Sequence, residues 1–123
     1  MGIYAEAKNG SRRSFSYLYW GWIRHIAEEE GVELAKSDSE TLSLTEDQTR
    51  RLASAIRARA EKVRKGLAPR DAKSYVDKID DRFFPPEQTP DEGKATAIDF
   101  DNPDTMDDTA KFFELSHGVA LTY

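Results

Sequence analysis

The chain has no cysteine among its 123 residues and only two histidines, which excludes several kinds of chemistry. Without cysteine there is no disulfide, no thiolate zinc site and no cysteine nucleophile. No run of residues approaches the roughly 18 apolar residues that a membrane span requires. No apolar segment near the start is typical of a signal peptide. We therefore expect a cytoplasmic protein that does not enter a membrane.

Charged residues are abundant, at 33% of the chain, and the net charge is −5. They are unevenly divided, because residues 1–70 hold 13 basic and 10 acidic residues whereas residues 71–123 hold 5 and 13. The negative balance argues against the whole molecule binding nucleic acid. The two parts of opposite charge either pair with each other in the fold or bind different partners.

The hydrophobic pattern predicts one α+β domain over residues 1–123, with three to four helices packed on a small sheet formed by the N- and C-terminal strands. Apolar residues spaced three and four apart predict helices at residues 14–31, 45–66, 69–83 and 102–118. Alternation predicts strands at residues 2–8, 98–100 and 119–123, with the first and last pairing. Residues 32–44 are typical of a polar connection, and residues 85–97 of a loop.

Capping residues support the helix ends. Ser14 and Asn102 are expected N-caps, and Thr45 with Gln48 forms a capping box. Gly31, Gly66 and Gly118 are expected to follow the last turns of their helices. The helix from residue 14 carries the apolar stripe, which indicates core packing more than a ligand pocket. Gly21 within it predicts the close approach of another backbone.

An acidic cluster lies near the start of the last helix, at Asp99, Asp101, Asp104, Asp107 and Asp108. A calcium loop of this kind requires glycine at its sixth position and glutamate at its twelfth, where this chain has Asp104 and Ala110. We therefore predict no metal site. The carboxylates either stabilise the start of the helix or form an acidic surface that binds a protein partner with a basic surface.

A basic helix covers residues 50–65, where Arg50, Arg57 and Arg64 recur every seven residues, accompanied by Arg59 and Lys65. One interpretation is a surface that follows the phosphates of DNA or RNA. No aromatic residue is interleaved to stack on bases, and the other part of the chain is acidic. The second interpretation is a solvated face or an ion-pair partner for residues 71–108.

Catalytic motifs are absent from the sequence, including the dinucleotide fingerprint, the phosphate-binding loop and the nucleophile elbow. Only His25 and His117 are candidates for general acid–base catalysis, and neither belongs to a motif. We expect that the protein is not an enzyme and that it binds no cofactor. An acid within hydrogen-bond reach of either histidine, in a polar cleft, would favour an enzyme instead.

Three segments resemble a group of short uncharacterised bacterial and phage proteins. They are the Met1-Gly2 start, the aromatic run Tyr19-Trp20-Gly21-Trp22, and the ending Phe112-Phe113-Glu114-Leu115-Ser116-His117-Gly118. His117 departs from the pattern, because a second small residue is expected there. The resemblance implies a small accessory or phage-borne protein, and it implies no activity.

These features together predict a non-enzymatic interaction or inhibitor protein that blocks the surface of a partner. Specific examples of such a protein are a phage anti-CRISPR protein, an anti-restriction protein and an immunity protein. The acidic cluster would carry the contact. The alternative is a nucleic-acid-binding accessory protein that uses the basic helix at residues 50–65.

Overall fold

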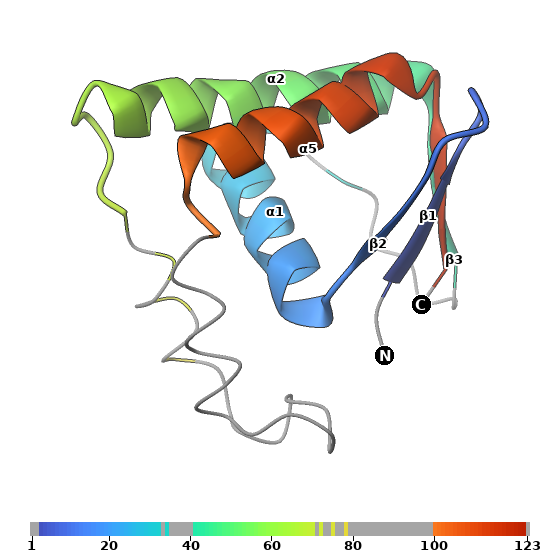
Figure 1. The fold of residues 1–123 in the computed structure, drawn as a ribbon, viewed down its shortest axis with the longest axis horizontal. Helices are drawn as coiled ribbons and strands as arrows, with labels where there is room; N and C mark the ends of the chain where they lie inside the picture. Colours follow the sequence, from blue (N-terminus) through green and yellow to red (C-terminus); the bar gives the residue numbers. More distant parts are fainter. Residues whose placement is uncertain are drawn as a thin grey trace.

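The fold places a four-stranded antiparallel sheet beside a group of helices, so the chain is of the α+β class (Figure 1). The computed structural model describes residues 3–32, 34, 41–70, 72, 75, 78 and 100–122. The described elements run in the order β1 (Ile3–Ala7), β2 (Arg12–Phe15), α1 (Tyr17–Glu29), β3 (Thr41–Leu44), α2 (Glu46–Arg64), α5 (Pro103–Leu115) and β4 (Val119–Thr122).

The sheet has the strand order β2-β1-β4-β3, so the N-terminal and C-terminal strands pair at its centre. Tyr4 lies opposite Thr122 in the β1–β4 pair, which confirms the predicted pairing of the two ends. The hairpin between β1 and β2 turns at Asn9 and Gly10. Gly10 has a φ of +92°, a left-handed value that a side chain would strain.

Two short strands were missed in the sequence. Residues 41–44 were assigned to a polar connection, but they form β3 along β4. Ser14 and Phe15 were placed on the first helix, but they belong to β2, and the N-cap of α1 is Ser16. Phe15 matched the helical stripe because the end of β2 and the following helix bury the same core.

The other helix ends follow the sequence more closely. Thr45 and Gln48 form the predicted capping box of α2, and Asn102 caps α5. Gly31 and Gly66 adopt positive φ after α1 and α2, as predicted. At the end of α5 the prediction was wrong, because His117 takes the left-handed conformation, with a φ of 60°, directly after the cap Ser116.

Two predicted elements lie largely outside the described residues. Of the helix predicted at residues 69–83, only residues 69, 70, 72, 75 and 78 are described. Of the strand predicted at residues 98–100, only Phe100 is described, and it lies in a turn. Three helices are therefore established within the described part of the chain.

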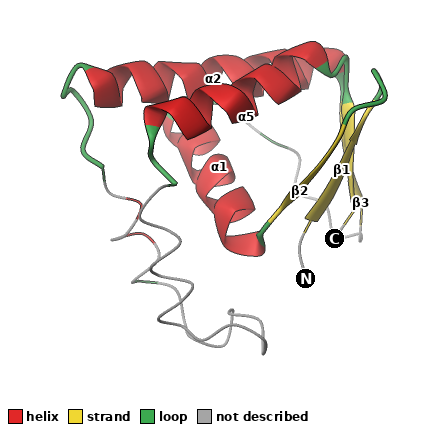
Figure 2. Cartoon of the chain, in the orientation of Figure 1, coloured by secondary structure: helices red, strands yellow, loops and turns green. Residues whose placement is uncertain are grey.

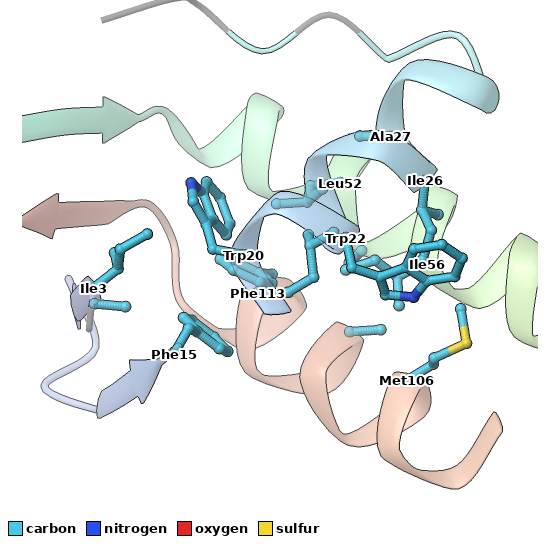
Figure 3. Packing of buried hydrophobic residues seen from close by; sticks show 14 of the residues in the cluster. Ile3, Phe15, Trp20, Trp22, Ile26, Ala27, Leu52, Ile56, Met106 and Phe113 are labelled. Atoms are coloured by element: carbon cyan, nitrogen blue, oxygen red, sulfur yellow. The ribbon is translucent and has the colours of Figure 1, made fainter. Parts of the chain in front are cut away.

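The core lies between the sheet and the helices, which all lie on one side of the strands (Figure 2). Figure 3 shows Trp20 and Trp22 from α1 packed among Leu52 and Ile56 from α2 and Phe113 from α5. The inner side chains of the strands alternate with exposed ones, as the pattern of β1 from Ile3 to Ala7 illustrates. The outer face of the sheet is therefore left without a covering layer of described helices.

Gly21 lies on the buried side of α1, and its neighbour is a side chain. A Cβ at Gly21 would lie 2.9 Å from the hydroxyl oxygen of Tyr75. The prediction that another backbone approaches Gly21 was therefore wrong, since an aromatic side chain occupies that space.

Candidate functional site

The basic and acidic parts of the chain meet between α2 and α5, which lie side by side (Figure 1). Arg64 lies 3.1 Å from an oxygen of Asp104 and 2.6 Å from an oxygen of Asp107. The hydrogen bond to Asp107 is the main reason that the pKa of Arg64 is raised. Arg57 lies seven residues before Arg64 on α2, about two helical turns, and forms an ion pair with Glu114. The two charged helices therefore pair with each other, at least in part.

Arg59 is a buried residue of the predicted basic surface, with only 7% of its surface exposed. Its Nη1 atom lies 2.9 Å from a carboxylate oxygen of Glu29 on α1. The guanidinium carbon also lies 5.9 Å from the ring centroid of Trp22, within cation–π range. Arg59 therefore joins α2 to α1 and does not present its charge to a nucleic acid.

The remaining basic candidates pair within α2. Arg50 forms an ion pair with Glu46, one turn earlier, and Lys65 lies 3.2 Å from Glu61. Both pairs are largely exposed, so each contributes little to stability. Each of the five residues predicted to bind nucleic acid thus has a carboxylate neighbour within the fold.

The predicted acidic cluster is divided by the structure. Asp101 is only 1% exposed, and its carboxylate accepts hydrogen bonds from Arg70 Nε and from the backbone N–H of Ala72, both at 3.1 Å. This carboxylate anchors the chain before α5 and cannot contact a partner. Asp104 and Asp107 pair with Arg64, and Asp99 lies outside the described residues.

Asp108 is exposed on α5, and its backbone carbonyl accepts a hydrogen bond from Arg13 at 3.3 Å. A charged hollow lies beside it between α2 and α5. Its lining includes Arg57, Glu61, Arg64, Asp104, Asp107 and Lys111. Because both signs of charge alternate around this hollow, it does not select a ligand of one charge.

His25 has an acid within hydrogen-bond reach, since its Nε2 atom lies 3.1 Å from an oxygen of Glu29. The imidazole stacks on Tyr75 with a centroid distance of 5.2 Å. Glu29 also binds Arg59, so this carboxylate already holds one cation. The arrangement joins α1 to α2 and to Tyr75, and it gives His25 a packing role.

His117 lies 3.8 Å from Glu46 at the start of α2, beyond normal hydrogen-bond distance. Among the described residues, no group of three histidine, aspartate or glutamate side chains is placed to hold a metal ion.

The outer face of the sheet is the surface that the sequence interpretation missed. Its exposed side chains are Tyr4, Glu6, Arg12, Ser14, Ser43, Ala120 and Thr122. One ion pair lies at the β2 side, where Arg12 is 3.5 Å from Glu6. The other exposed side chains of the described strands on this face are uncharged, and Lys8 lies at its end. The alternation of residues in β1 indicated that one side of this strand is exposed. The extent of the exposed face could not be predicted, because it depends on β1 pairing with strands from other parts of the chain.

A shallow hollow marks one end of this face, where β1, β3 and β4 run side by side. Its lining includes Glu6, Lys8, Ser43, Leu44, Thr45 and Ala120. Ala7 and Val119 also line it, so the hollow combines apolar surface with a few polar groups.

Comparisons with known protein families, with characterised proteins and with solved structures found no match to this chain. Within the part of the chain that the structure describes, no helix combines the length and apolar character needed to cross a membrane.

Proposed function

We propose that this protein is a non-enzymatic binding protein that occupies the surface of a protein partner through the open side of its sheet. One observation carries the proposal: the outer face of the sheet has no covering layer of described helices, and its charged strand residues, Glu6 and Arg12, pair with each other. Most of the charged residues first considered as sites pair within the fold.

The composition of this face suits a protein interface. Tyr4, an aromatic residue, is 54% exposed on this face. Its cross-strand neighbours are Ser14 on β2 and Thr122 on β4. The centres of protein interfaces are enriched in tyrosine and depleted of charged residues. A flat face of this kind fits a partner that buries Tyr4 near the middle of the contact.

A basic partner surface is supported by the overall charge of −5. Complementary charge speeds encounter even where it adds little to affinity. Asp104 and Asp108 remain exposed on α5 and contribute to this field. We retain Asp104, Asp107 and Asp108 as a secondary contact. A phage anti-CRISPR, anti-restriction or immunity protein acting in the cytoplasm remains the concrete form of the proposal.

Capture from nuclease-treated lysate of the source organism tests this function. We expect the tagged chain to retain a stoichiometric protein partner. A variant combining Tyr4→Lys and Ala120→Lys should lose that partner, because it places two cations on the outer face. The control Lys111→Gln changes charge on α5 and should retain the partner. If nuclease removes every partner, or if both variants capture it equally, the proposal fails.

The alternative, a nucleic-acid-binding accessory protein, remains a prediction of the sequence. No contact among the described residues favours it, since its candidate side chains pair with Glu46, Glu114, Glu29, Asp107 and Glu61.

A further inference from the structure

We infer that Asn9 is a site of spontaneous deamidation, that the folded hairpin slows this reaction, and that the acidic product weakens the junction of β1, α5 and β4. The inference goes beyond the proposed function and does not depend on it. It follows from the sequence of the β1–β2 turn, from the hydrogen bonds of the reacting groups, and from the position of Asn9 beside the end of α5.

The turn between β1 and β2 contains the residue pair that favours this reaction. Asn9 precedes Gly10, and both residues are exposed to solvent. Glycine has no Cβ, so its backbone nitrogen can approach the side-chain amide of the preceding residue with little steric hindrance. The other asparagine of the chain, Asn102, precedes Pro103. The proline nitrogen carries no hydrogen and cannot form the same ring. We therefore expect deamidation at Asn9 and not at Asn102.

The reaction needs only water and a base that removes one proton. The Gly10 nitrogen loses its hydrogen and attacks Cγ of Asn9, which closes a succinimide ring. The Cγ–Nδ2 bond then breaks, and the amide nitrogen takes up a proton and leaves as ammonia. Water opens the ring at either of its carbonyl groups, which gives aspartate or β-linked aspartate. The chain gains one carboxylate, and no atom is oxidised or reduced.

Hydrogen bonds hold each of the reacting groups in the folded hairpin. The Gly10 N–H, whose nitrogen is the nucleophile, donates to the Ala7 carbonyl at 3.0 Å. The leaving group, Asn9 Nδ2, donates to the Leu115 carbonyl at 2.7 Å, and Asn9 Oδ1 accepts from the Ser11 N–H at 2.8 Å. Backbone amides held in this way exchange their hydrogens mainly when the structure opens locally. Deamidation of the folded chain should therefore depend on opening of the hairpin.

The same contacts determine what the product does to the fold. Leu115 is the last residue of α5, and its carbonyl lies at the negative end of the helix dipole. The Asn9 side chain supplies an N–H donor there, and the Asn9 backbone N–H donates to the Ser116 carbonyl at 3.2 Å. A carboxylate has no N–H and would place negative charge against the Leu115 carbonyl. Deamidation therefore removes a hydrogen bond that joins the β1–β2 turn to the end of α5.

Peptide mass spectrometry of the aged protein tests the site and its protection. The natural chain is kept in mildly alkaline buffer, either folded or unfolded in urea, and samples are digested at intervals. We expect conversion at Asn9 and not at Asn102, at a rate about tenfold or more lower in the folded chain. Equal rates in the two states, or no conversion of Asn9 in urea, would overturn the inference.

Ser116→Ala tests whether the junction provides this protection. The buried Ser116 hydroxyl donates to the Phe113 carbonyl at 2.6 Å and accepts from the Gly118 N–H at 3.3 Å. Its loss should loosen the junction that holds Asn9. We expect Asn9 of this variant to convert about threefold or more faster than in the natural folded chain. The control Ser43→Ala, exposed on β3, should convert at the natural rate. Equal rates in the two variants would contradict protection by the junction.

Asn9→Asp reproduces the product with a normal backbone and tests its effect on the fold. We expect this variant to unfold at a lower urea concentration than the natural chain, because it loses the N–H donor to Leu115. Ser11→Asp is the matched control, since it adds the same charge to the same exposed turn and leaves the Asn9 side chain intact. Equal unfolding midpoints for Asn9→Asp and the control would refute the weakening of the junction.

Discussion

Gly21 illustrates how a single missing side chain can permit a contact. Replacing it with alanine would favour the helix by about 1 kcal/mol. The added Cβ would lie 2.9 Å from the Tyr75 hydroxyl oxygen, and such overpacking costs about 1–3 kcal/mol. We expect Gly21→Ala to lower the free energy of unfolding in urea. In a Tyr75→Phe background the same change should become neutral or stabilising. A loss of the same size in both backgrounds would contradict this explanation.

Asp101 is the buried carboxylate of the former acidic cluster. Asp101→Ala would leave the Ala72 N–H and the Arg70 guanidinium without this acceptor, so we expect a loss of about 1–3 kcal/mol in the free energy of unfolding. Asp108→Ala on the exposed face should change it by less than about 0.5 kcal/mol. Equal effects of the two substitutions, measured by chemical denaturation, would refute the anchoring role of Asp101.

Tyr19 gives the stability a dependence on alkaline pH. Burial raises its pKa above the ordinary value of 10.0, although the Thr109 hydroxyl and Arg13 oppose this shift. The unfolded chain therefore ionises first. The stabilisation is complete below pH 10.0 and is lost as the pH rises through the pKa of the folded state. Between about pH 9 and 11 we expect Tyr19→Phe to show a shallower loss of unfolding free energy than the natural chain. If the unfolding free energies of Tyr19→Phe and of the natural chain fell in parallel over this pH range, the role of Tyr19 would be refuted.

At the scale of elements, the packing of α1 against α2 depends on Arg59. Arg59→Gln would break its ion pair with Glu29 and remove the cation above Trp22. We expect a cost of about 1–3 kcal/mol, because Arg59 is nearly buried. Arg57→Gln is the matched control on the same helix. Its pair with Glu114 is about half exposed, so the cost should stay below about 0.5 kcal/mol. The free energies of unfolding of both variants are measured in urea. An equal or smaller loss for Arg59→Gln than for Arg57→Gln would contradict this ranking.

The success of sequence interpretation also varies among the elements. α2 and α5 were predictable because their caps, Thr45 and Asn102, act on backbone groups two or three residues away. β2 and β3 were not, because four residues give little alternation. Phe15 of β2 also matched the apolar stripe of the following helix, and the partner of β3 is distant in sequence. β3 pairs with a strand more than 70 residues later.

The candidate site was even less accessible to sequence interpretation. The recurrence of Arg57 and Arg64 predicted a cationic face, but only tertiary structure brings that face against Glu114 and Asp107. Asp101 could not be distinguished from its neighbours by residue type, and its burial depends on Arg70 and Ala72. The outer face of the sheet could not be defined before β3 itself was known.

For the whole molecule, the distribution of charge predicts weak interaction with nucleic acid. The net charge is −5 and the basic side chains of α2 pair with carboxylates. We expect no binding to labelled duplex DNA or single-stranded RNA at about 0.15 M salt in fluorescence anisotropy. Binding that falls steeply with salt and is lost on Arg50→Gln and Arg57→Gln would support the alternative function instead.

The position of β4 has a consequence for how the protein is made. β4 lies between β1 and β3, so neither neighbour can complete its ladder until residues 119–122 have left the ribosome. Until then the hairpin of β1 and β2 has no second sheet partner, and the apolar side of β3 has no strand beside it. Pairings this distant in sequence form slowly and leave surfaces exposed that favour aggregation. During synthesis, therefore, we expect these strands to stay exposed until β4 has emerged.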